Sequence, residues 1–160
     1  MIYITGDTHS DFTRFTEDKF PIQSEMTKND YVIICGDFGG VWTFEEESGR
    51  EKKKLWIRDF SWWDLELPTK EEMENGINNL EKVNYKVDYI ISHCCPTSIQ
   101  TILGSGTYKK DYLTDYFQNI MEKCEFKKWY FEHYHDYRQV NSQFILVYED
   151  IVPLEFESIF

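Results

Sequence analysis

Short apolar runs recur along the chain, and each stops abruptly at small or polar residues. The sharpest is YVIIC at residues 31–35, which ends at a glycine and an aspartate. A continuous apolar run bounded by turn residues is typical of a strand that is covered on both faces in a parallel sheet. The same pattern predicts strands at 2–5, 87–92 and 128–132, and the runs at 144–148 and 151–154 predict antiparallel strands that close a second sheet.

Helical spacing appears between these runs. Thr69 and Glu72 form a capping-box pattern ahead of apolar residues spaced three to four apart, which predicts an amphipathic helix over 70–83. A second apolar stripe predicts a helix over 111–124 that begins next to Asp111.

Three further segments have weaker patterns. Ser10 and Asp11 are suited to cap a short helix that Pro21 ends. Acidic and basic blocks at helical spacing predict an exposed helix around 45–54. The glycines of the sequence GSG at 104–106 predict a connecting loop.

Length and composition fit one soluble domain of the α/β class. The 160 residues, of which 41% are hydrophobic, suit a single core over 1–160. No apolar stretch approaches the ~20 residues that span a bilayer, and the N-terminus lacks a signal-peptide pattern, so we expect a cytoplasmic protein without membrane contact. The net charge of −12 disfavours nucleic acid as a partner. The four cysteines form no C-x-x-C pair and predict reduced thiols.

The residues that follow the predicted strands are the strongest functional signal. The chain has four histidines, and all of them lie at strand exits together with two aspartates. These residues are Asp7, His9, Asp37, His93, His133 and His135. Open α/β sheets bind ligands beyond the carboxyl ends of their strands, so we expect these side chains to converge.

Imidazoles and carboxylates together suit Mn, Fe or Zn better than Mg or Ca. In Asp7-Thr8-His9 and in His133-Tyr134-His135 the candidate ligands are two residues apart, which would turn them to one face in extended backbone. The set therefore predicts a metal centre.

In this order, Asp7-x-His9, Gly36-Asp37, His93 and His133-x-His135 resemble the calcineurin-like metallophosphoesterases over residues 1 to about 150. The resemblance implies a layered α/β/β/α sandwich and hydrolysis of a phosphomonoester or phosphodiester by a metal-activated hydroxide. It implies two divalent metal ions, one held by Asp7, His9 and His135 and the other by His93 and His133. Asp37 would bridge the two ions and serve in catalysis.

The sequence departs from the family pattern at three places. Gly40 stands where the family has the last aspartate of G-D-x-x-D, and Glu132 stands where a glycine usually precedes the final His-x-His. The G-N-H-[DE] motif is absent, since no asparagine in the chain precedes a histidine. Its absence predicts a weakened second metal site and an internal deletion that truncates the middle of the sandwich, with its junction near 52–58.

Two arginines are candidates for contacts with a phosphate ester substrate, namely Arg14 and Arg138, although surface ion pairs are the alternative for both. Two other functions stay open, a non-catalytic binding or scaffold module and an inactive relic on the same fold. The aromatic residues at 56–63 would form the contact surface of a scaffold, and the sequence identifies no protein partner.

Overall fold

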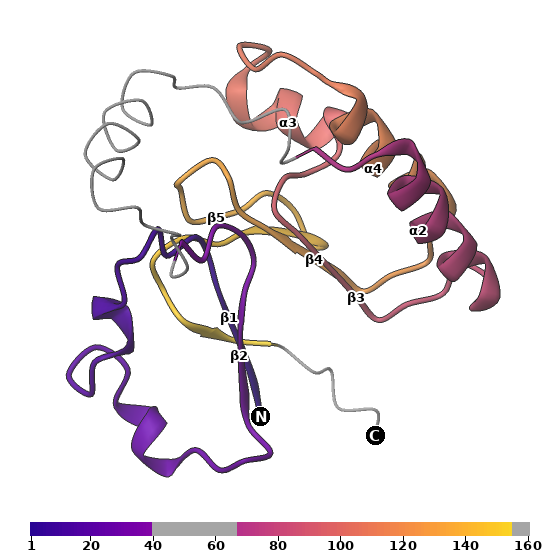
Figure 1. Cartoon of the computed structure of the whole chain (residues 1–160). Helices are drawn as coiled ribbons and strands as arrows, with labels where there is room; N and C mark the ends of the chain where they lie inside the picture. The colour runs from indigo at the N-terminus through magenta and orange to yellow at the C-terminus, as the bar shows by residue number, and fades with distance from the viewer. Residues whose placement is uncertain (40–66, 155–160) are drawn as a thin grey trace, which may run out of the picture.

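The computed structural model describes residues 1–39 and 67–154, and these residues form an α/β protein with two mixed sheets (Figure 1). The strand order is β2-β1-β7 in the first sheet and β3-β4-β6-β5 in the second. The predicted helix at 45–54, the aromatic residues at 56–63, Gly40 and the junction near 52–58 lie outside the described residues.

The first sheet is built on β1 (Ile2–Thr5). This strand pairs in parallel with β2 (Tyr31–Ile34) and antiparallel with β7 (Val152–Pro153). Among the described residues β2 is therefore an edge strand, and Tyr31 at its start is 59% exposed. The strand is parallel as predicted, but its residues are exposed or only partly buried within the described ranges, so the predicted cover on both faces is incomplete there.

The second sheet contains three parallel strands, β3 (Tyr89–Ser92), β4 (Lys128–Phe131) and β6 (Phe144–Leu146). The short strand β5 (Arg138–Gln139) pairs antiparallel with β6. The chain reverses at the β5–β6 hairpin, and β6 consequently runs in the direction of β4. Both predicted strands are present, but they do not close one second sheet: β6 is parallel to β4 and antiparallel to β5, and β7 pairs antiparallel with β1 in the first sheet.

The two sheets pack against each other through a small apolar core. Its buried members are Ile4, Cys35, Tyr130, Val147 and Leu154, which come from both sheets and the segments that follow their strands. Successive side chains of a strand point to opposite faces, so the neighbours of Tyr130 in β4 point away from this core.

The opposite face of the second sheet is covered by helices (Figure 1). Trp129 and Phe131 pack there with Ile99 and Ile120 from the helices. These helices are α2 (Lys70–Lys82), α3 (Thr97–Gly104) and α4 (Tyr112–Lys123). None of the helices in the described ranges has the length and apolar character needed to cross a membrane.

Local capping explains where two of these helices begin. Thr69 and Glu72 form the predicted capping box at α2, and the Asp111 carboxylate accepts hydrogen bonds from two backbone N–H groups at the start of α4. Both predicted helices are confirmed. The sequence analysis did not predict α3, which ends at Ser105 in left-handed backbone with a φ of 50°.

The segment between β1 and β2 contains two 3-10 helices, at Thr13–Phe15 and Pro21–Glu25. The N-cap position of the first helix is Phe12, and the Thr13 N–H donates to the Asp11 carboxylate just before it. Pro21 begins the second helix and does not simply end the first, because its fixed φ and missing N–H suit a first helical position. The ring of Phe20 packs edge-on against Tyr3 at 5.2 Å and covers the first sheet on its outer side.

Candidate metal centre

The candidate ligands gather where strands of both sheets end. Asp7 and His9 follow β1, Asp37 follows β2, and His93 follows β3. Glu132, His133 and His135 follow β4. Because β1 and β2 are parallel, as are β3 and β4, each sheet delivers its residues at a carboxyl edge.

One group of ligand atoms consists of Asp7, His9 and His135, and these atoms lie within 4.8 Å of one another. His9 Nε2 is 3.4 Å from Asp7 Oδ2, and His135 Nε2 is 3.6 Å from the same oxygen. The structure thus brings together the three residues that the family resemblance assigns to one metal.

A second group contains Asp7, His93 and Glu132, again within 4.8 Å. His93 Nδ1 lies 3.4 Å from Asp7 Oδ1 and 3.9 Å from Glu132 Oε2. The Asp7 carboxylate therefore faces one group with each of its oxygens. Its side chain is almost completely buried, which fixes it between the two groups.

Asp37 and His133 lie beside these groups and belong to neither. The Asp37 side chain is 46% exposed, with Oδ2 4.0 Å from His9 Nδ1. His133 Nδ1 lies 2.9 Å from His93 Nε2. The pKa of His133 lies below its usual value, because partial removal from water and the nearby His93 disfavour a charged ring. A neutral ring is the form that binds a metal.

The backbone of Asp37 has a clear structural role. Its N–H donates to Asp7 Oδ1 at 2.6 Å, and its carbonyl accepts from the N–H groups of Thr8 and His9 at 2.9 and 3.0 Å. The ends of β1 and β2 are held together by these bonds, which also orient the Asp7 carboxylate.

Three of the histidines have left-handed backbone, with φ values of 44° at His9, 77° at His133 and 48° at His135. The expectation of extended backbone at these positions was wrong, because the chain turns as soon as each strand ends. Left-handed backbone costs an L residue about 1–2 kcal/mol. Strained positions of this kind collect at functional sites, which makes the three histidines stronger candidates.

Two glycines make room for the cluster. A Cβ atom at Gly36 would lie 1.9 Å from Asp7 Oδ1 and 2.4 Å from His93 Nδ1. A Cβ atom at Gly6 would lie 2.5 Å from Glu132 Cγ. Both positions must therefore lack a side chain for the carboxylates to occupy their places.

Gly6 is also the point at which the end of β1 meets the segment after β6. Its N–H donates to the carbonyl of Tyr148 at 2.8 Å, and the Thr5 hydroxyl donates to the same carbonyl. The ring of Tyr148 stacks on His135, with centroids 5.2 Å apart. Tyr148 thus supports the cluster from the C-terminal part of the chain.

Glu132 is the residue whose role the sequence analysis did not identify. It is fully buried and ends the apolar run of β4, and a carboxylate at the end of such a run was the signal available. Burial, a hydrogen bond with Asp7 and the negative charge of Asp7 raise the pKa of Glu132 to about 9.

The pKa of Asp7 moves the other way. Burial alone would raise it, but hydrogen bonds from His93 and Glu132 and the Asp37 N–H together hold it below the usual range. A buried pair of carboxyl groups beside imidazole nitrogens provides oxygen and nitrogen ligands with negative charge to neutralise. These residues fit a divalent cation of the Mn, Fe or Zn kind.

The two candidate substrate residues have partners within the protein. Arg14 Nη2 donates to the Asp7 carbonyl at 2.6 Å, and Nη1 donates to the Thr5 hydroxyl and the carbonyls of Gly6 and Tyr148. Arg138 pairs with Asp136 at 2.9 Å and is half exposed. A phosphate contact by either arginine stays a prediction.

The cysteines near the cluster are structural. Cys35, Cys94 and Cys95 are buried free thiols, and burial raises the pKa of each to about 12. Cys94 follows His93 directly but belongs to neither ligand group.

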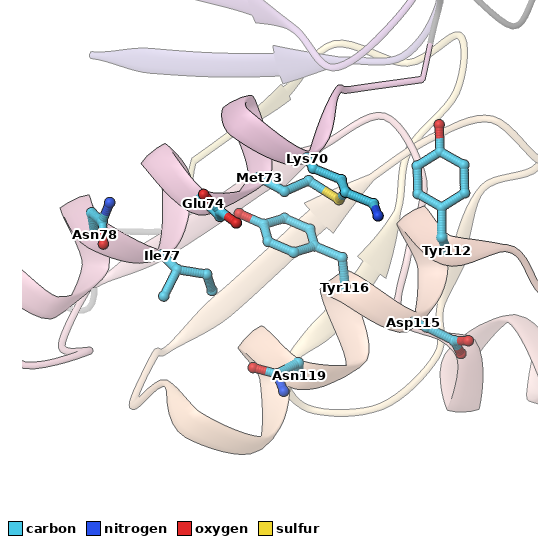
Figure 2. A pocket seen from close by; sticks show the side chains of 9 residues that line it. All are labelled: Lys70, Met73, Glu74, Ile77, Asn78, Tyr112, Asp115, Tyr116 and Asn119. Carbon is cyan, nitrogen blue, oxygen red and sulfur yellow. The ribbon is translucent and has the colours of Figure 1, made fainter.

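An open groove of about 570 Å³ lies between α2 and α4, away from the cluster (Figure 2). It contains none of the candidate ligands, and its lining comprises Lys70, Met73, Glu74, Ile77, Asn78, Tyr112, Asp115, Tyr116 and Asn119. The candidate ligands and this groove therefore lie in different parts of the molecule.

The fold and the cluster define an α/β protein with a histidine and carboxylate site at the carboxyl ends of its strands. Comparisons with family models, curated proteins and solved structures give no match to this chain.

Proposed function

We propose that the chain is a metal-dependent phosphoesterase that hydrolyses a phosphomonoester or a phosphodiester with two divalent ions, of Mn, Fe or Zn. The observation that carries the proposal is the position of Asp7, whose two oxygens face two separate groups of ligand atoms. A buried carboxylate that faces ligand atoms on two sides is suited to lie between a pair of cations.

The proposal includes the fold type. Two sheets that share an apolar core, with helices on the outer face of the second, support a layered α/β/β/α sandwich. In the described residues the outer side of the first sheet is covered by Phe20 and the short 3-10 segments.

In the proposed reaction, bound divalent ions supply a hydroxide nucleophile at neutral pH and neutralise charge on the phosphoryl oxygens. Asp7 holds its position between both sites through the Asp37 N–H. His9 and His135 provide nitrogen ligands on one side and His93 on the other. The partly exposed Asp37 carboxylate, next to His9, is within reach of solvent and contributes a further oxygen toward the reacting water.

The test is Mn²⁺-dependent hydrolysis of aryl phosphate mono- and diesters by purified, monodisperse protein. Asp7→Asn and Asp37→Asn are prepared in the same way. The matched control is Asp88→Asn, since the exposed Asp88 forms an ion pair with Lys127 and lies outside the cluster.

We expect Asp7→Asn to lower the rate more than about 100-fold, because a shared ligand is lost. Asp88→Asn should retain the full rate. Folded protein that gives no metal-dependent turnover above the Asp7→Asn level would contradict the proposal and favour a non-catalytic role.

A further inference from the structure

We propose that Glu132 is itself a metal ligand, and that with Asp7 and His93 it holds the second of the two ions. The inference rests on the metal centre of the proposed function and names a residue that the family resemblance does not supply. Its basis is the position of the Glu132 side chain and the hydrogen bonds of its two oxygens.

The two oxygens of Glu132 have different surroundings. Oε2 accepts a short hydrogen bond from the N–H of His133, which fixes the carboxyl group at the end of β4. Oε1 is buried and has no hydrogen-bond partner within the described part of the chain. A buried acceptor in native proteins normally has a partner, so an unsatisfied oxygen indicates a group that binds there.

The carboxyl group of Glu132 faces His93 and, beyond it, Asp7. Its Oε2 is 3.9 Å from His93 Nδ1, which in turn is 3.4 Å from Asp7 Oδ1. The three ligand atoms lie within 4.8 Å of one another, close enough to surround one ion after small side-chain movements. Two carboxylates and one imidazole form a ligand set typical of Mn, Fe or Zn.

The alternative to a bound cation is a protonated Glu132 that donates a hydrogen bond to Asp7. A shared proton would relieve the repulsion between the two carboxyl groups, and the hydrogen bond between Glu132 and Asp7 is the metal-free form of this arrangement. A cation contacts oxygens of both groups at once and neutralises both. The cation therefore satisfies more of this arrangement than a proton does.

The backbone on both sides leaves space for this group. Gly6 and Gly36 have no Cβ at the points where one would meet Glu132 Cγ, Asp7 Oδ1 and His93 Nδ1. Gly36 leaves space for Asp7 and His93, and Gly6 leaves space for Glu132, so the two glycines together accommodate all three members of the group. The two glycines therefore favour a constructed site.

The test is Mn²⁺ binding to the full chain at pH 7, measured by calorimetry and by electron paramagnetic resonance. Glu132→Gln keeps the shape and the hydrogen-bonding capacity of a protonated glutamate but removes the negative charge. Glu17→Gln is the matched control, because Glu17 is exposed and far from the strand ends in sequence. His93→Ala tests the same site through a partly exposed residue, in case the buried substitution prevents folding.

We expect the unmodified chain and Glu17→Gln to bind two ions with an exchange-coupled spectrum. Glu132→Gln and His93→Ala should bind one ion with an uncoupled six-line spectrum, whereas His9→Ala should lose the other ion. Two ions bound by Glu132→Gln would overturn the inference, as would an unmodified chain that binds fewer than two. Two ions without hydrolysis would reject the proposed function alone.

Discussion

The carboxyl groups of Asp7 and Glu132 lie side by side at the ends of β1 and β4, and both are almost completely buried. Each approaches the same atom, His93 Nδ1, at 3.4 Å and 3.9 Å. The first sheet supplies one carboxyl group and the second sheet the other, so the interface between the sheets ends in a pair of acids. That pair of carboxyl groups can share a proton or bind a cation. The expected pH dependence and metal affinity follow from these two states.

The stability of the metal-free protein should depend on pH through Glu132. Its pKa rises from 4.5 to about 9 on folding, so between these values the folded state holds a proton that the unfolded state has lost. Stability should be fully present below pH 4.5 and fall toward pH 9, by up to about 1.4 kcal/mol per pH unit.

Urea unfolding in the presence of a chelator from pH 5 to 8 measures this slope. Glu132→Gln should remove the fall, because the amide does not titrate, and Glu17→Gln should retain it. The same slope in the Glu132→Gln protein would assign the effect to another group.

Gly36→Ala should disturb the metal centre directly. The added methyl group would occupy the places of Asp7 Oδ1 and His93 Nδ1, so both side chains must move. We expect a loss of about 1–3 kcal/mol in stability from overpacking and a loss of about 10–100-fold in Mn²⁺ affinity.

Gly106→Asn is the matched comparison, since Gly106 has open space around it and a φ of 84° that asparagine tolerates. Thermal unfolding and metal titration of the two variants separate the clash at the site from a general effect of glycine loss. Equal Mn²⁺ affinity in the Gly36→Ala and Gly106→Asn proteins would contradict the expected clash of the added methyl group with Asp7 and His93.

Arg14→Ala should weaken the fold more than substrate binding. The guanidinium group donates to Tyr148 and to three residues at the end of β1, and its loss leaves buried acceptors unpaired. Hydrogen bonds to charged groups each contribute about 1.5–3 kcal/mol, so we expect a loss of at least that size.

Arg138→Ala is the control, because its exposed ion pair with Asp136 contributes at most about 1 kcal/mol. Chemical denaturation and Michaelis constants for both variants distinguish the roles. A raised KM with unchanged stability in Arg14→Ala would instead support the phosphate contact predicted from the sequence.

Asp111→Ala should destabilise α4. Its carboxylate accepts from the N–H groups of Leu113 and Thr114 at 2.9 and 2.8 Å, and loss of such a cap typically costs about 1 kcal/mol. Lys109→Ala, in the same exposed loop, should have no measurable effect. Thermal unfolding of both proteins tests whether the cap behaves as its geometry indicates.

Local patterns predicted the elements that carry their own signals. The strands at 2–5 and 128–132 and the helices that begin after Thr69 and Asp111 were visible in apolar spacing and capping residues. The gathering of ligand candidates was predictable too, because parallel strands end at a common edge.

Non-local features were not predictable in this way. The strand β5 contains two residues and gains its structure from pairing with β6. The apolar run at 151–154 predicted the strand β7 but not that its partner would be β1 of the first sheet. The burial of Glu132 depends on Gly6, which comes from the other sheet. Which Asp7 oxygen faces which histidine likewise follows from packing and not from spacing along the chain.

The contact between Gly6 and Tyr148 joins the beginning of the described chain to its last strands. The Thr5 hydroxyl donates to the same Tyr148 carbonyl, and these two residues are 143 positions apart in the sequence. Contacts of such long sequence separation form late in folding. A nascent chain that stops before β6 contains all four histidines and lacks this support. The candidate ligand groups should therefore reach their final geometry only after the segment that follows β6 has packed against the end of β1.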